Sequence, residues 1–183
     1  AALLRLMAAW TGDAAMRESI NRLPERLVAA MELDWVEALA SFAGARSAMT
    51  IGRGPTLAIA REAALKLKET CNIHAEAFSS AEFQHGPMTL IEAAYPVLLF
   101  APSDEAARGI EAFRVKLTRM GASVLSTERL SGPAFLPTLE PDHPDADAIC
   151  QVQAFYRLLL QIAARRGSDV DRPRHLNKVT TTR

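Results

Sequence analysis

Three charged residues in one amphipathic segment have a spacing that could bring them together on one side of a helix. Glu62, Lys66 and Glu69 follow one another at steps of four and three residues, which places them on one narrow arc. Ile59 and Leu65 flank this arc, so the charges project between apolar neighbours. A carboxylate can carry a proton between two atoms of a substrate, and a lysine can supply a charge or a nucleophile. The pattern alone leaves two interpretations open, a polar pocket or a Glu62–Lys66 pair on a solvated surface.

A histidine stands at a predicted turn further along the chain. His85 precedes Gly86 and Pro87, which end a short helix that Ser79 or Ser80 begins. Imidazole titrates near neutral pH and turns often display functional groups, so His85 is a candidate for proton transfer. A simple cap at the helix C-terminus is the alternative.

The end of the chain, residues 167–183, gathers charged side chains that include Asp169, Asp171, His175 and Lys178. Their spacing matches no metal-binding motif, and we expect no metal site. The segment has no helical or strand period. From its pattern alone it is predicted to be a frayed terminus.

A glycine-rich turn, Gly52-Arg53-Gly54, lies between a predicted strand and a predicted helix. A dinucleotide-binding fingerprint needs a third glycine where this chain has Leu57, so a nicotinamide-dependent oxidoreductase is a weak alternative. A tight turn explains the glycines by itself. The free backbone amides at the helix start could also bind an anion, and we therefore predict that Gly52, Arg53 and Gly54 bind substrate.

These candidates are set on alternating strands and helices. Apolar positions at three- and four-residue spacing predict leading helices over 1–10, 13–31 and 34–45. Short apolar runs predict strands over 48–52, 73–78, 96–101, 122–126 and, weakly, 135–140, with helices over 55–70, 104–120 and 146–166. The alternation predicts an α/β fold, a three-layer αβα sandwich with a five-stranded parallel, flavodoxin-like sheet. Open sheets of this kind bind ligands at the carboxyl ends of their strands, so we expect the three charged residues near that edge.

The composition excludes several other classes of protein. Lysine plus arginine number 21, as do aspartate plus glutamate, and this zero net charge does not favour nucleic acid as a partner. Cys71 and Cys150 are the only cysteines, which argues against a disulfide framework and indicates a reducing compartment, the cytoplasm. The apolar stretches are too short for a membrane span, so we expect no membrane partner.

Three longer segments carry a family resemblance. They are GRGPTLAIAREAALKLKE at 52–69, IHAEAFSSAEFQHGPM at 73–88 and GSDVDRPRHLNKVT at 167–180. In this order and spacing they resemble the second sugar-isomerase (SIS) domain of the two-SIS phosphosugar enzymes. The likeness is to the isomerase half of glucosamine-6-phosphate synthase (glutamine–fructose-6-phosphate aminotransferase) and to its amino-sugar deaminase relatives. Three motifs are jointly specific for this family: E-x-x-x-K-x-x-E, H-G-P and the closing D-x-D-x-P-R-x-L-x-K-V-T.

The resemblance implies catalytic roles for five residues. Glu62, Lys66 and Glu69 would line the isomerase site, with Glu69 as the base that moves a proton between sugar carbons 1 and 2. His85 would assist ring opening from a neighbouring subunit, and Lys178 would meet the ketose carbonyl. No metal or organic cofactor is implied. The family often has lysine where this chain has Gln84 before H-G-P, so one positive charge near the sugar is expected to be absent.

The resemblance also implies an organisation and partners. Residues 1–45 would be a helical lead-in, made of the end of a first SIS domain and interdomain helices. Residues 46–166 would form the SIS domain, and 167–183 an active-site tail. We expect a sugar-phosphate substrate, a homodimer, and a missing N-terminal SIS domain that would carry the phosphate-binding loop.

The expected function is aldose–ketose isomerisation or deamination of amino-sugar 6-phosphates, such as glucosamine 6-phosphate or fructose 6-phosphate. No glutaminase domain is visible in these residues, which leans toward the deaminase branch. The alternative is a noncatalytic SIS module that binds a phosphosugar and regulates a partner. The joint presence of Glu69, His85 and Lys178 favours the enzyme, because a sensor needs no proton shuttle.

Overall fold

Four parallel strands form the centre of the molecule, and the computed structural model describes residues 1–173. The strands are β1 (Ser47–Gly52), β2 (His74–Ser79), β3 (Pro96–Leu99) and β4 (Ser123–Ser126). The α-helices are α1 (Ala2–Thr11), α2 (Ala14–Met31), α3 (Val36–Ala43), α4 (Pro55–Cys71), α5 (Ile110–Arg119) and α6 (Pro144–Arg165). Three short 3₁₀ helices are η1 (Glu82–His85), η2 (Pro87–Leu90) and η3 (Glu105–Ala107). None of these α-helices combines the length and hydropathy needed to cross a membrane.

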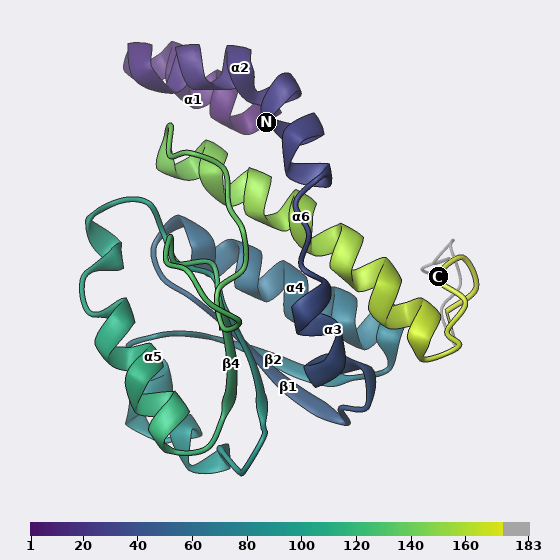
Figure 1. Cartoon of the computed structure of the whole chain (residues 1–183). Helices are drawn as coiled ribbons and strands as arrows, with labels where there is room; N and C mark the ends of the chain where they lie inside the picture. The colour runs from purple at the N-terminus through teal and green to yellow at the C-terminus, as the bar shows by residue number, and fades with distance from the viewer. Residues whose placement is uncertain (174–183) are drawn as a thin grey trace, which may run out of the picture.

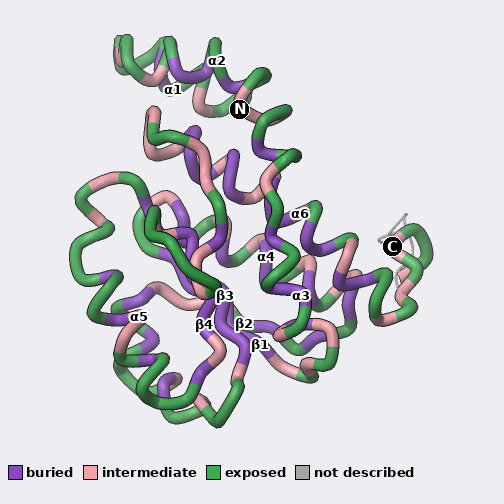
Figure 2. Tube along the Cα trace, in the orientation of Figure 1, coloured by how far each residue is buried: buried purple, intermediate pink, exposed green. Residues whose placement is uncertain are grey.

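The sheet has the order β2-β1-β3-β4, which is the flavodoxin-like order for its first four strands. Helices lie on both sides of the sheet (Figure 1), and β1 and β3 are buried along most of their length (Figure 2). Alternate side chains of the strands enter two separate cores. Leu98 faces the core built with α3, α4 and α6, whereas Val97 and Leu99 face the core built with α5 and η1. The predicted three-layer αβα sandwich is therefore confirmed.

The fifth predicted strand is wrong for the described chain. Of the segment 135–140, only Phe135 makes a β-bridge, to Ser126 of β4. The backbone N–H of Leu136 also bonds to Ser126, but the N–H of Glu128, which would form the next bond of the ladder, bonds to the Ser126 hydroxyl at 3.2 Å. The carbonyl of Pro137 instead accepts a hydrogen bond from the Trp35 indole at 2.8 Å. The segment thus follows the edge of the sheet without becoming a strand.

The single helix predicted over 104–120 is divided in two. Residues 105–107 form η3, and α5 begins only at Ile110. Gly109 between them has φ 83°, a left-handed conformation that ends one turn and starts the next. Because the apolar period continues across the break, the pattern could not reveal it.

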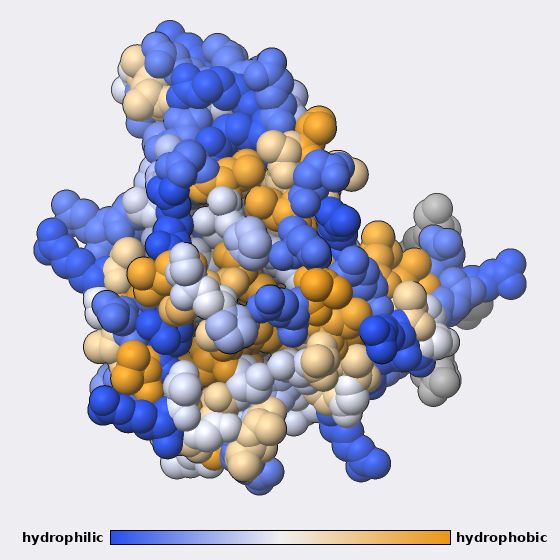
Figure 3. All heavy atoms as spheres, viewed as in Figure 1, coloured by the Kyte–Doolittle hydropathy of each residue, from blue (hydrophilic) through white to orange (hydrophobic). Residues whose placement is uncertain are grey.

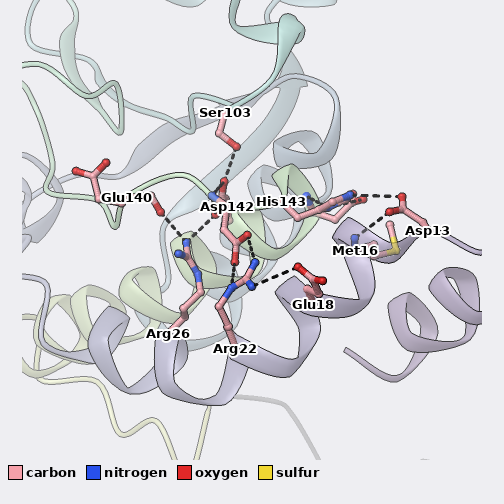
Figure 4. A network of polar contacts seen from close by, with 11 residues as sticks. Asp13, Met16, Glu18, Arg22, Arg26, Ser103, Glu140, Asp142 and His143 are labelled. Carbon is pink, nitrogen blue, oxygen red and sulfur yellow. Dashed lines mark hydrogen bonds and ion pairs between the residues drawn. The ribbon is translucent and has the colours of Figure 1, made fainter.

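The α1–α2 pair projects from the sandwich (Figure 1), and α2 is anchored to the start of α6 by an apolar cluster around Leu23 and Cys150 and by a network of polar contacts (Figure 4). Arg26 donates to Asp147 at the start of α6 at 2.7 Å, and Asp147 also accepts from Ser103 at 2.6 Å. Arg22 pairs with Asp142 at 2.6 Å. Side chains of the Arg26–Asp147 pair are only 17% and 9% exposed, so water screens this contact little.

Hydrophilic residues cover most of the α1–α2 pair on the face drawn in Figure 3. Large apolar side chains of α1 are nevertheless exposed, among them Leu3, Leu6 and Trp10. Such a surface suits a helix that packs against a further part of a longer protein. The assignment of residues 1–45 to a lead-in between domains stays a prediction.

The turn between β1 and α4 depends on Gly52. A Cβ atom added there would lie 2.7 Å from the backbone nitrogen of Leu57, and closer still to the carbonyl of Thr56. Gly54 has φ 56° and ψ −132°, which only glycine adopts readily. The tight packing of the first turn of α4 on the end of β1 therefore accounts for both glycines.

We predict that Gly52→Ala destabilises the protein by about 3 kcal/mol or more, because backbone atoms of α4 must move to admit the methyl group. Gly44→Ala is the matched control, since nothing lies within 4 Å of a Cβ at Gly44 and its φ is negative. Its expected effect is within about 1 kcal/mol. Urea unfolding measures both, and equal effects of the two substitutions would contradict the packing argument.

We also predict that Asp147→Ala costs about 3 kcal/mol of unfolding free energy, because it leaves the partly buried Arg26 guanidinium without its partner. Glu18→Ala removes an exposed carboxylate 4.0 Å from Arg22, with a side chain 72% exposed, and serves as control. That change should be nearly neutral. Thermal unfolding at equal salt compares them, and a neutral Asp147→Ala would show that α2 is held by apolar contacts alone.

Candidate active site

Helix α4 presents its charged arc along a packed interface. Its buried residues are Thr56, Ala60, Ala63, Ala64, Leu67 and Cys71. These side chains are mostly small, so α4 packs closely on the sheet and on α6. Glu62, Lys66 and Glu69 are half-buried along the border of this face. The structure therefore does not place the three charges on a fully solvated surface.

The three charged residues do not form one hydrogen-bonded cluster: Lys66 pairs with Glu69, and Glu62 pairs with Tyr156. The Lys66 ammonium donates to a Glu69 carboxylate oxygen at 2.7 Å. Glu62 instead accepts from the phenol of Tyr156 on α6 at 2.8 Å. The Glu62–Lys66 pair, one of the two interpretations left open by the sequence, is thus not formed. Glu62 acts on Lys66 only through its charge.

The electrostatics follow from these contacts. The hydrogen bond to Glu69 raises the pKa of Lys66 above its ordinary value, although desolvation opposes the shift. Lys66 therefore stays charged at neutral pH. Burial, followed by the hydrogen bond and charge of Glu62, raises the pKa of Tyr156 to about 12. The phenol therefore keeps its proton and acts as a donor at neutral pH.

Glu69 lines a hollow of about 600 Å³ at the end of α4. The other lining residues are Ala43, Gly44, Thr70, Cys71, Asn72, Arg166, Gly167, Ser168, Asp169, Arg172 and Pro173. Most of them carry polar or charged groups, and several belong to the start of the chain's last segment. This hollow has the polar lining that a hydroxylated substrate would need.

Arg166 holds the walls of the hollow together. Its guanidinium donates to the backbone carbonyls of Cys71, Ala43 and Ala45 at 2.6, 2.8 and 2.9 Å, joining the ends of α3 and α4 to the end of α6. Gly167 follows at φ 65° and ends α6 in a Schellman motif. Residues 168–173 are thereby directed to the side of the hollow.

The expected position of Glu69 at the carboxyl edge of the sheet is wrong. Helix α4 starts where β1 ends and returns antiparallel to the strands, so Glu69 lies near the start of β2 and the residues before β1. Fourteen helical residues separate Pro55 from Glu69, which is about 20 Å. The crossover geometry of a parallel sheet therefore places the glutamate at the amino edge.

The remaining predicted residues do not meet Glu69 in the described chain. Gly52, Arg53 and Gly54 lie at the opposite end of α4. His85 is exposed at the end of η1, whose Phe83 enters the core on the α5 face of the sheet. Lys178 lies outside the described residues.

A second cavity of about 470 Å³ lies at the carboxyl edge, between the loops after β3 and β4 and the start of α6. Its walls include Trp35, Pro102, Leu130 and Leu139, with Thr127 and Gln151 among the polar residues. None of the predicted site residues within 1–173 lines it. It is where an open sheet usually binds ligands, but the chemistry predicted from the sequence lies elsewhere.

The sequence alone did not reveal the contact of Tyr156 with Glu62 or that of Arg166 with the backbone of Cys71. Tyr156 stands in an apolar helix, where a phenol needs a hydrogen-bond partner when it is buried, and this was the available signal. Arg166 resembled an ordinary basic residue at a helix C-terminus.

Comparison with known proteins agrees with this fold. The family model of the SIS domain matches residues 41–127. Residues 41–127 have the SIS fold. A solved structure from Silicibacter pomeroyi, assigned as a phosphosugar isomerase, matches it with a TM-score of 0.84 and 38% identity, over 92% of this chain and 52% of that one. The C-terminal domain of glucosamine-fructose-6-phosphate aminotransferase from Francisella tularensis matches with a TM-score of 0.76 and 26% identity, over 84% and 46% of the two chains.

Curated relatives place this SIS domain within longer proteins. The glutamine–fructose-6-phosphate aminotransferase (isomerizing) of Pseudomonas syringae pv. tomato is 34% identical over 182 residues, which are 92% of this chain and 29% of the relative. The enzyme of the same name from Bradyrhizobium diazoefficiens is 35% identical over 175 residues, with 29% of its length covered. The chain thus spans less than a third of these relatives, and a glutaminase domain missing from these 183 residues says nothing about the branch.

Proposed function

We propose that this chain is the second SIS domain of a phosphosugar enzyme that isomerises or deaminates hexose 6-phosphates, such as fructose 6-phosphate and glucosamine 6-phosphate. The observation that carries the proposal is the Lys66–Glu69 pair at 2.7 Å beside a polar hollow. The side chains of the pair are about a third exposed, 32% for Lys66 and 31% for Glu69, so a substrate could reach them. The aminotransferase and isomerase names of the relatives support the same reaction class.

Glu69 is the proposed base that moves a proton between sugar carbons 1 and 2. The carboxylate oxygen not bonded to Lys66 is available to take the proton from one carbon and return it to the next. Lys66 supplies a fixed positive charge beside the developing enediol or enamine. Lys178 is proposed to meet the ketose carbonyl, where an imine would make the neighbouring C–H more acidic.

His85 is proposed to assist ring opening in the site of a neighbouring subunit. Within the described chain it does not line the hollow of Glu69, and the two residues stand on different faces of the sheet. A two-fold dimer would bring each His85 to the partner's site. The phosphate of the sugar would be held by a first SIS domain. The turn Gly52-Arg53-Gly54 stays a proposed substrate-binding segment.

We predict that Glu69→Gln lowers the isomerisation rate of the two-domain enzyme by about 10²–10⁴-fold with a much smaller effect on substrate binding. The amide keeps the shape of the side chain but cannot accept the proton. Glu76→Gln, an exposed change on β2, is the control. A normal rate for Glu69→Gln would move the base to another residue, with Glu62 the next candidate. Intact sugar-phosphate binding without any turnover in the unmodified two-domain enzyme would instead favour the noncatalytic regulatory module.

A mixing experiment tests the shared site. Full-length His85→Ala and Glu69→Gln are each expected to be inactive, and their heterodimers should contain one intact composite site. Activity should recover to at most about half per dimer. If subunits exchange and the mixture remains inactive, both residues belong to one chain's site.

A further inference from the structure

Two partners compete for the Glu62 carboxylate. Lys66 stands one helical turn further along α4, in the order in which glutamate and lysine attract each other best. Tyr156 reaches the same carboxylate from α6 at 2.8 Å. In the structure Glu62 bonds to the tyrosine, and the Lys66 ammonium bonds to Glu69.

Tyr156 is delivered to Glu62 by a rigid part of the fold. Helices α4 and α6 pack together in the same core and run in the same direction, since both start near the carboxyl edge and end near Cys71. The Cys71 thiol donates to the carbonyl of Leu159 at 3.7 Å, one turn beyond Tyr156. The ring of Tyr156 packs beside Phe155, with centroids 6.2 Å apart. Its hydroxyl therefore has a fixed position and little entropy to lose on bonding.

We propose that Tyr156 is a positioning residue of the candidate active site. By donating to Glu62, it keeps this carboxylate away from Lys66 and so leaves the lysine ammonium to Glu69. The inference rests on the proposed function.

The energetic reason is that pairs at three- and four-residue spacing on a helix are similar in strength. Without the tyrosine hydroxyl, nothing among the described contacts of Glu62 would favour Glu69 over Glu62 as the partner of Lys66. The ammonium would then divide its time between the two carboxylates. The phenol is a suitable device, because its pKa of about 12 makes it a donor that does not add negative charge at neutral pH.

The contact can be tested in the chain itself, without turnover. The chain has two tyrosines, Tyr95 and Tyr156, and ¹³C NMR of labelled phenol rings resolves them, with Tyr156→Phe assigning the signals. We expect Tyr156 to titrate near pH 12 and its pKa to fall in Glu62→Gln. Glu76→Gln, an exposed change on β2, should leave it in place. An unchanged Tyr156 titration in Glu62→Gln would overturn the proposal.

A crystal structure of Tyr156→Phe at neutral pH is a second test of the pairing of Lys66, and it does not require alkaline conditions. The proposal expects the Lys66 ammonium to move to a position between Glu62 and Glu69. If it remains on Glu69 alone, as in the parent, the tyrosine does not control the pairing and the proposal fails.

Activity of the two-domain enzyme separates positioning from mere structure. Tyr156→Phe should lower the isomerisation rate, but by a smaller factor than the roughly 10²–10⁴-fold expected when the base itself is lost. Tyr95→Phe should leave the rate unchanged. In a Glu62→Gln background the competing charge is gone, so adding Tyr156→Phe should have no further effect. Independent, additive losses would overturn the proposal. If the unmodified two-domain enzyme shows no turnover, the proposed function fails, and the titration and crystal structure still decide the Tyr156–Glu62–Lys66 arrangement.

Discussion

The contact between Gly52 and the first turn of α4 is the constraint on which the position of the candidate site depends. The backbone of Thr56 and Leu57 approaches the end of β1 so closely that no side chain fits at residue 52. This approach fixes where α4 begins and how it is rotated about its axis. The rotation in turn buries the small residues of α4 and sets Glu62, Lys66 and Glu69 along the border with α6.

A parallel sheet with crossover helices has two chemically different edges in this protein. At the carboxyl edge, the loops after β3 and β4 enclose a cavity whose walls are largely apolar. At the amino edge, the ends of α3, α4 and α6 meet through Arg166 and surround the polar hollow of Glu69. The distance between the edges is set by the length of α4, about 25 Å for a helix of 17 residues. A charged residue late in a crossover helix therefore serves the edge away from the one where open sheets usually bind ligands.

The site holds one cation, Lys66, and two carboxylates, Glu62 and Glu69, and the cation forms a hydrogen bond with only one of them. Lys66 bonds directly to Glu69 and only faces the charge of Glu62, whose hydrogen-bonding need is met by a neutral phenol. A neutral donor satisfies a carboxylate without bringing a second positive charge. These three groups thus keep a net negative charge beside the polar hollow.

The sequence by itself determined the fold class and the order of most elements, because apolar period, glycine and proline signals are local properties of the chain. The likeness to SIS domains came from the resemblance of three longer segments. It also singled out Glu62, Lys66 and Glu69, whose spacing alone places them on one arc of a helix. It overestimated the sheet, since a bridge at Phe135 and a strand through Pro137 look alike until the neighbouring hydrogen bonds are known. Only the tertiary structure decided which edge of the sheet the arc serves and which partner each charge takes. Tyr156 is 94 residues from Glu62 and Arg166 is 95 from Cys71, and contacts between such distant positions arise from helix packing, which no local pattern encodes.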